Sequence, residues 1–493
     1  MPSHLFQVDD VFRPIVEELV VLSAGSTLSL ALCCKSLTDL SLSVLWERQK
    51  RLSTLIKVLP PDAWTYEETD SPAGELTIVR DLSPEEWKKL RKYASWMREL
   101  EFLEDEDEIS QDVFDVLFRC PHPEPICPRL VKLTWVADSV FGGDFVHFFS
   151  PQLREVRLSS RPGTVFSFAQ SISTLPILSL KTLSLSVAGD HTVRGAILSL
   201  LKTCPKNLRT LEVTRMNQLC DGSWCRILIL LYRLRTLETD QFPPTCTLPA
   251  TAYFPSLQQV TFRGPVAPRW IQFLSESSGQ KVPSATGIRP RIVAPHLRKL
   301  YLEYEFELDS TFTFPLRMFR NLSALQLKSA CSHDVCAFRL TDEDVSQLAT
   351  QLPELRQLSL GTPCPHNDCM TTVDSLLSLS THCKELRELR LHFNTRNFAR
   401  DMKNSIHNAL RHTPHPPSRC PLTILDVWQT PLTPDALGAD LFPTLIGLVD
   451  IFPRLQRIMH RSRSPLDAWG WQRLDAQIAS FQEMRTSLPS MFA

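Results

Sequence analysis

The chain has 493 residues, more than one ordinary globular core accommodates, so it needs several domains or a fold that grows by stacking. Its apolar content of 43% excludes wholesale disorder, and its net charge of -1 excludes a strongly basic, nucleic-acid-binding composition. The sequence opens without a signal segment, its 14 cysteines are scattered, and no apolar run approaches the about 20 residues that cross a bilayer. We therefore expect a reduced, cytoplasmic or nuclear protein that binds neither membranes nor nucleic acids.

Residues 1–60 differ from the rest of the chain because their apolar residues recur at helical spacing. Three short helices are predicted, and their apolar faces carry Phe12, Ile15, Leu19, Leu28, Leu37, Leu45 and Trp46. Helices this short cannot bury such faces alone, so another surface must cover them. Either a partner protein or the chain's own following residues can supply that surface.

This segment resembles an F-box. The resemblance rests on the stretch from Ala31 through Cys33 to Leu37, followed nine residues later by Trp46. An F-box usually opens with Leu-Pro, and in this chain the proline is displaced to Pro14. The resemblance implies that the apolar face described above docks on a Skp-type adaptor, which in turn binds a cullin.

Residues 61–95 are predicted to be a linker with one helix. The stretch 67–74 is polar and rich in turn-forming residues. The helix is expected to start after Ser83, because a serine cap, Pro84 in the first turn and the two following acids are a favourable helix start.

From residue 96 to 464 a hexad recurs in which an apolar residue, usually Leu, stands at the first and fourth positions and, in all but two cases, at the sixth. The first residues of the thirteen hexads are Met97, Leu130, Leu153, Leu180, Leu208, Leu234, Leu257, Leu297, Leu322, Leu355, Leu386, Leu422 and Leu455. The last two apolar residues alternate with polar ones, as in a half-buried strand, and the recurrence indicates a leucine-rich-repeat solenoid.

Helices are predicted between several hexads, for example after the cap Thr341, and prolines such as Pro353 end them. Residues 465–493 are predicted to form a helix that caps the last repeat. The predicted fold class is therefore α/β: an F-box-like three-helix segment followed by an irregular solenoid with parallel strands on its concave face and helices outside.

The fifth residue of each hexad is predicted to point to the concave face, because side chains alternate along a strand. The residues predicted to bind a target there are Glu212, Glu238, Thr261, Tyr301, Gln326, Ser359, Arg390 and Asp426. Their mixed charges suit a protein or peptide rather than a polyanion.

Two loops share the order Cys, one residue, His, two residues, Cys. The candidate metal ligands are Cys331, His333, Cys336, Cys364, His366 and Cys369. Stacked repeats would bring these donors of a tetrahedral zinc site together. Neither spacing is a zinc signature, and packing of buried thiols is the simpler interpretation, so we predict no metal and no cofactor.

The sequence contains no phosphate-binding loop, dinucleotide fingerprint or zinc-protease helix, and we predict that the chain is not an enzyme. An F-box followed by leucine-rich repeats resembles the substrate receptors of SCF-type ubiquitin ligases, and in particular the expanded F-box-like families of mushroom-forming basidiomycete fungi. The resemblance implies that the repeats hold a protein target while the F-box binds the Skp-type adaptor and cullin. The alternative is a recognition scaffold outside any ligase, whose N-terminal helices cap the solenoid.

Overall fold

The computed structural model describes residues 3–33, 35–67, 74–103, 109–120, 124–137, 145–160, 172–175, 179–187, 191–203, 207–215, 222–240, 251–263, 291–304, 316, 319–329, 336–361, 369–402, 404, 420–430, 432, 441–461 and 465–487. The chain divides into two compact units, Met1–Leu219 and Cys220–Ala493, which are described in turn. Among the helices of the described ranges, none is both long and apolar enough to cross a membrane.

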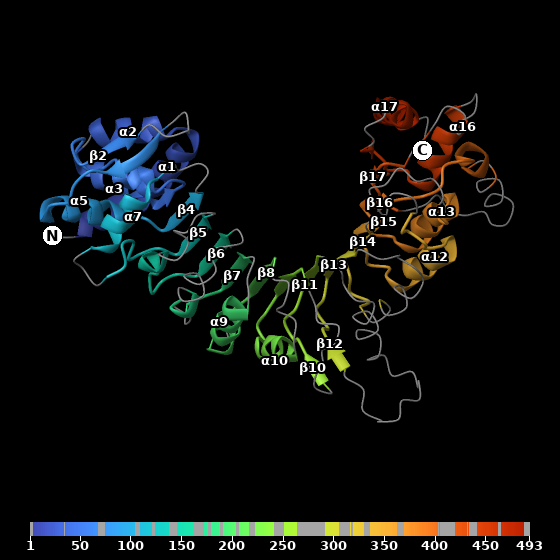
Figure 1. Ribbon diagram of the computed structural model, residues 1–493. Helices are drawn as coiled ribbons and strands as arrows, with labels where there is room; N and C mark the ends of the chain where they lie inside the picture. The colour runs from blue at the N-terminus through green and yellow to red at the C-terminus, as the bar shows by residue number, and fades with distance from the viewer. Residues whose placement is uncertain are drawn as a thin grey trace. The chain divides into compact units, whose positions relative to one another are not determined.

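The first unit begins with three helices at the places where the sequence predicts them, α1 (Ser3–Leu22), α2 (Ala24–Cys33) and α3 (Lys35–Glu47) (Figure 1). A guanidinium nitrogen of Arg13 lies 2.5 Å from a carboxylate oxygen of Glu47 and joins α1 to the end of α3. The chain then forms a two-residue strand, β1 (Arg48–Gln49), and a single helical turn, α4 (Ser53–Ile56).

The segment that follows α4 contains more structure than the predicted linker. Strands β2 (Trp64–Glu67) and β3 (Glu75–Ile78) pair in antiparallel fashion. Helix α5 (Pro84–Ala94) starts as predicted, because the Ser83 hydroxyl accepts from the backbone of Glu86 while the Glu86 carboxylate accepts from the backbone of Ser83. The Arg80 guanidinium also donates to this carboxylate and, with the Ser83 backbone, lowers the pKa of Glu86 to about 2.

The hexads of the first unit open five parallel strands in sequence order: β4 (Glu99–Leu103), β5 (Lys132–Ala137), β6 (Glu155–Ser160), β7 (Thr182–Val187) and β8 (Thr210–Thr214). Strand β1 pairs in parallel with β4 and so adds one strand before the first hexad. Helices α7 (Gln111–Phe118) and α9 (His191–Thr203) lie between hexad strands in the sequence.

The hexads of the second unit open eight more parallel strands: β9 (Thr236–Thr239), β11 (Gln259–Phe262), β13 (Lys299–Tyr304), β14 (Ala324–Ser329), β15 (Gln357–Gly361), β16 (Glu388–Leu391), β17 (Ile424–Asp426) and β18 (Arg457–Met459). The helices of this unit are α10 (Gly222–Leu230), α12 (Asp342–Gln351), α13 (Val373–His382), α16 (Leu441–Ile451) and α17 (Pro465–Ser487). Strands β10 (Thr251–Tyr253) and β12 (Arg291–Val293), which no hexad predicts, form a separate parallel pair.

Within the described ranges, ten of the thirteen hexads turn the chain into their strands in the same way. The backbone N–H of the first leucine donates to the carbonyl three residues earlier, as in Leu355 to Leu352 and Leu386 to Cys383. The fourth and sixth residues then align from strand to strand, and the leucines of β14, β15 and β16 at these positions are at most 1% exposed. Burying each such side chain contributes about 1.5–3 kcal/mol, which makes these rows the core of the unit. The predicted α/β class, with parallel strands and intervening helices, is confirmed.

Consecutive repeats are also joined through their helices. Figure 1 shows α12 and α13 on the same side of the strands that precede them. Asp342, the first residue of α12, accepts from the backbone of Thr372 at 2.7 Å and of Ser375 at 3.1 Å, and from the Thr372 hydroxyl at 2.8 Å. This carboxylate therefore caps the N-terminus of the next repeat's helix.

Helix α17 lies where the sequence predicts a C-terminal helix, and it covers the last strand. Asp475 accepts from the backbone N–H of Ile458 in β18 at 2.5 Å. Trp471 is fully buried against Phe393 and Phe398, and its indole N–H donates to the Thr430 carbonyl at 2.9 Å. The helix thus seals apolar surface and satisfies a backbone donor at an edge strand, as a capping element must.

Candidate functional site

The sheet face that carries the third and fifth hexad residues, here called the open face, is the candidate site in the second unit. Because the strands pair in register, the fifth residues form one continuous row: Glu238, Thr261, Tyr301, Gln326, Ser359, Arg390, Asp426 and Met459. Seven of the eight residues predicted for target binding belong to this row, and Met459 extends it beyond the prediction.

A groove of about 300 Å³ lies on the open face over β13 to β18. Its lining includes Tyr301, Gln326, Ser359, Arg390, Asp426 and Met459 from the fifth positions. Third-position residues, among them Gln357 and Glu388, complete it. The groove therefore combines one aromatic ring, amides, a hydroxyl and charges of both signs, which is the chemistry of a site for a polypeptide.

The charged end of the groove is fixed by contacts within the chain. The Arg390 guanidinium lies 2.7 Å from the Asp426 carboxylate and 5.0 Å from the ring of Trp428. Asp426 is 2% exposed and also accepts from the Trp428 backbone at 2.9 Å, while Arg461 approaches it to 3.5 Å. The buried Asp426 carboxylate and the Trp428 ring hold the Arg390 guanidinium in place, while a third of the Arg390 side chain stays exposed.

The polar end of the groove offers a hydroxyl that is free to bind. The Ser359 hydroxyl oxygen is buried and has no hydrogen-bond partner among the described residues. Burial, with the charge of Glu388 nearby, raises the pKa of Tyr301, so its phenol stays protonated and available as a donor near neutral pH. A peptide backbone lying in the groove could satisfy both groups.

The remaining predicted target-binding residues lie elsewhere. Glu238 pairs with Arg263 at 2.8 Å, and Thr261 is buried between the neighbouring strands. Glu212 belongs to β8 in the first unit, where it accepts from the Ser184 hydroxyl at 2.7 Å. None of these three lines the groove over β13 to β18.

The second candidate surface lies on α1 and α2, where large apolar side chains face solvent. Phe12 is 37% exposed, Ile15 55% and Leu28 46%. Four neighbours that the sequence prediction did not name are more exposed still, namely Val11, Val21, Leu22 and Leu32. We call these seven residues the helical apolar surface. Large exposed apolar side chains are common on surfaces that bind other proteins.

The rest of the predicted adaptor-binding face is taken up by the chain itself. Leu37 and Trp46 on α3 are each 9% exposed, and Leu19 and Leu45 are half-buried. The Trp46 ring lies 4.8 Å from the ring of Tyr93 on α5, which packs in turn on Trp96. Helix α3 is thus an internal support, and α1 and α2 present the free surface.

The candidate zinc ligands are only partly described. Cys331, His333, Cys364 and His366 lie outside the described residues, whereas Cys336 and Cys369 are buried. Within the described ranges no group of three His, Cys, Asp or Glu residues is placed to hold a metal.

Other thiols are structural. The Cys383 thiol donates to the carbonyls of Ala349 and Leu352 in the preceding repeat, and burial raises its pKa to about 12. Cys127 is equally buried, with a pKa of about 12. Such thiols remain protonated and act as small packing residues.

The hexads, the parallel register and the intervening helices define the class of this protein: both units have the architecture of leucine-rich repeats. No protein-family model matches the chain, and no curated protein matches its sequence.

Three of the solved structures that resemble the chain illustrate the similarity. An internalin (inlF) from Listeria monocytogenes has 14% identity and a TM-score of 0.35, covering 78% of this chain and 86% of its own. The yeast Rad7 and Elc1 complex has 14% identity and a TM-score of 0.37, with coverages of 93% and 90%. The leucine-rich repeat-containing protein LegL7 from Legionella pneumophila has 11% identity and a TM-score of 0.28, with coverages of 74% and 94%.

Proposed function

We propose that this chain is the target-recognition subunit of an SCF-type ubiquitin ligase. The helical apolar surface binds a Skp-type adaptor and, through it, a cullin, and the open-face groove holds a protein target. The chain supplies proximity and orientation, while its partners supply the chemistry of ubiquitin transfer. This function requires no catalytic group, metal or cofactor in the chain itself.

The observation that carries the proposal is the contrast between α3 and the two helices before it. Trp46 and Leu37 anchor α3 inside the first unit, and β1 joins the sheet directly after it. Helices α1 and α2 thereby pack against a helix that is fixed in the fold, while Ile15, Leu28 and Leu32 remain exposed. Exposed apolar side chains on a supported helix pair favour a protein partner over a role in the chain's own core.

The second candidate function is a recognition scaffold that never joins a ligase. The pairing of β1 with β4 and the hydrogen bond from Arg98 to the Glu47 carbonyl at 2.9 Å favour it, because they make the N-terminal helices part of the first repeat. A terminal cap needs such contacts and needs no partner. The exposed residues on α1 and α2 are what this second function leaves unexplained.

Affinity capture of the full chain from eukaryotic cells separates the two functions. Under the ligase proposal the wild-type chain recovers a Skp-type adaptor and a cullin. The double variant Ile15→Asp, Leu28→Asp should reduce this recovery at least about tenfold, because two carboxylates would be desolvated in the contact. The matched control is Leu230→Asp on α10, a 63% exposed leucine in the second unit, which should leave recovery unchanged.

Both variants change exposed side chains, so circular dichroism should show an unaltered fold. Recovery of the adaptor by a folded double variant would place the contact elsewhere than on α1 and α2. Recovery of neither partner by the folded wild-type chain would reject the ligase role and leave the scaffold.

A further inference from the structure

The second residue of each hexad forms a row of its own at the edge of the sheet where the strands begin. This residue is Arg or Lys in eight of the thirteen hexads and is acidic in none. In the first unit the basic members are Arg98, Arg154, Lys181 and Arg209. In the second unit they are Arg235, Arg298, Arg356 and Arg387, here called the basic edge.

The backbone holds the basic edge at a regular spacing. The N–H of Ser323 donates to the Arg298 carbonyl, that of Arg356 to the Ser323 carbonyl and that of Arg387 to the Arg356 carbonyl, each at 2.8 Å. Neighbouring parallel strands lie about 4.8 Å apart, so Arg356 and Arg387 are one strand spacing apart and Arg298 is two from Arg356. The backbones of these arginines are hydrogen-bonded to neighbouring strands, and their side chains are exposed.

The charges of the basic edge are poorly neutralised. Arg356 approaches Glu385 only to 3.9 Å, with both side chains more than half exposed, and such a pair contributes little. No ion pair links Arg298 or Arg387 to an acidic residue of the described ranges. Like charges on neighbouring strands repel each other, so an acidic ligand would relieve an unfavourable arrangement.

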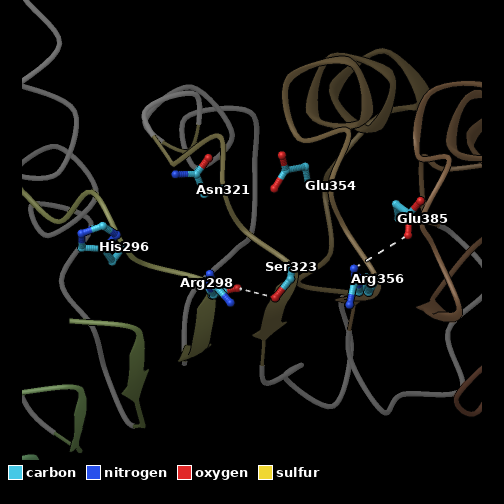
Figure 2. A pocket seen from close by; sticks show the side chains of 7 residues that line it. All are labelled: His296, Arg298, Asn321, Ser323, Glu354, Arg356 and Glu385. Carbon is cyan, nitrogen blue, oxygen red and sulfur yellow. Dashed lines mark hydrogen bonds and ion pairs between the residues drawn. The ribbon is translucent and has the colours of Figure 1, made fainter. Parts of the chain in front are cut away.

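A cavity of about 570 Å³ opens along the basic edge. Figure 2 shows that its lining comes from successive repeats: His296 and Arg298, then Asn321, then Glu354 and Arg356, then Glu385. The Asn321 side chain donates to the Pro295 carbonyl at 3.1 Å, which leaves its amide oxygen as an acceptor. The cavity thus offers guanidinium donors together with amide and carboxylate acceptors.

We propose that the basic edge and this cavity bind an acidic segment of a partner polypeptide laid across the starts of β13 to β16. Asp or Glu side chains of the segment would pair with Arg298, Arg356 and Arg387, and its backbone N–H groups would donate to Glu354 and Glu385. Guanidinium groups suit carboxylates because their paired N–H donors match the two oxygens. This surface is separate from the open-face groove and does not depend on adaptor binding.

The same residues argue against a nucleic acid. Glu354 and Glu385 line the same cavity as Arg298 and Arg356 and would repel a continuous chain of phosphates. Single-stranded nucleic acids also need aromatic platforms for their bases, and among the described residues that line the cavity the His296 imidazole is the only aromatic ring. A polypeptide has both the anionic side chains and the backbone donors that this lining requires.

Fluorescence anisotropy of a labelled glutamate-rich peptide with the full chain tests the proposal. We expect saturable, salt-sensitive binding that weakens about tenfold in the variant Arg298→Gln, Arg356→Gln, Arg387→Gln. The matched control removes three exposed arginines away from the edge, with Arg226→Gln, Arg396→Gln and Arg473→Gln, and should bind as the wild type does.

Three results would overturn the proposal. The peptide does not bind the folded chain, or both triple variants weaken it equally, which would mean nonspecific charge attraction. The third is that oligouridylate RNA binds more tightly than the peptide and loses affinity in the edge variant, which would assign the edge to a nucleic acid instead.

Discussion

Trp46 is held in place by its own chain. Its ring lies against Tyr93 and it is 9% exposed. The carbonyl of Glu47, its neighbour in the sequence, accepts a hydrogen bond from the backbone N–H of Arg98. Ile15 has the opposite setting, since more than half of it faces solvent on α1. The two residues occupy one apolar pattern in the sequence, yet only packing decides which of them stabilises the fold and which is available to a partner.

Two alanine variants check this difference in urea unfolding followed by far-UV circular dichroism. Trp46→Ala should lower the free energy of unfolding by about 3–5 kcal/mol, because it leaves a cavity between α3 and α5. Ile15→Ala should change it by no more than about 0.5 kcal/mol. Equal losses for both would show that Ile15 also packs within the chain, and the helical apolar surface would then not be free.

At the scale of elements, the hexad predicts thirteen strands, and the structure has a strand at every one of these positions. The prediction succeeds because the pattern is local and its apolar residues are buried wherever the strands stack. The same period predicts the row of fifth residues on the open face. Strand β1 could not be predicted: it has two residues, and its pairing depends on Glu99 in a different repeat. The pairs β2–β3 and β10–β12 carry no hexad either.

The candidate site shows the same limit. Alternation along the strands predicts Arg390 and Asp426 on one face, but the cation that completes their cluster, Arg461, comes from beyond β18. The burial of Trp46 depends on Tyr93, which lies in another element. The sequence does contain the basic edge, as Arg or Lys at the second hexad position, but a pattern defined by the apolar positions alone does not predict it.

Asp342 tests how the repeats of the second unit hold together, because one carboxylate of α12 accepts hydrogen bonds from the N-terminus of α13. Asp342→Ala should lower the free energy of unfolding by about 1–2 kcal/mol, the cost of losing a helix cap. The neighbouring variant Glu343→Ala, at an exposed position of the same helix, should cost less than about 0.5 kcal/mol. Thermal or urea unfolding measures both, and equal costs would mean that the inter-repeat cap is not a source of stability.

At the scale of the whole molecule, the candidate surfaces are distributed over both units. The first unit presents apolar residues on α1 and α2 and fixes them through α3 and β1. The second unit carries the groove over β13 to β18 and the basic edge beside it. Under the proposed function, adaptor and target use different residues, because the helical apolar surface and the groove share none.

Hydrogen–deuterium exchange of the full chain, with and without a purified Skp-type adaptor, tests whether α1 and α2 bind the adaptor. We predict slower exchange in α1 and α2, around Ile15 and Leu28, and unchanged exchange in β13 to β18 when the adaptor binds. Absence of a complex, or protection confined to β13 to β18, would contradict it.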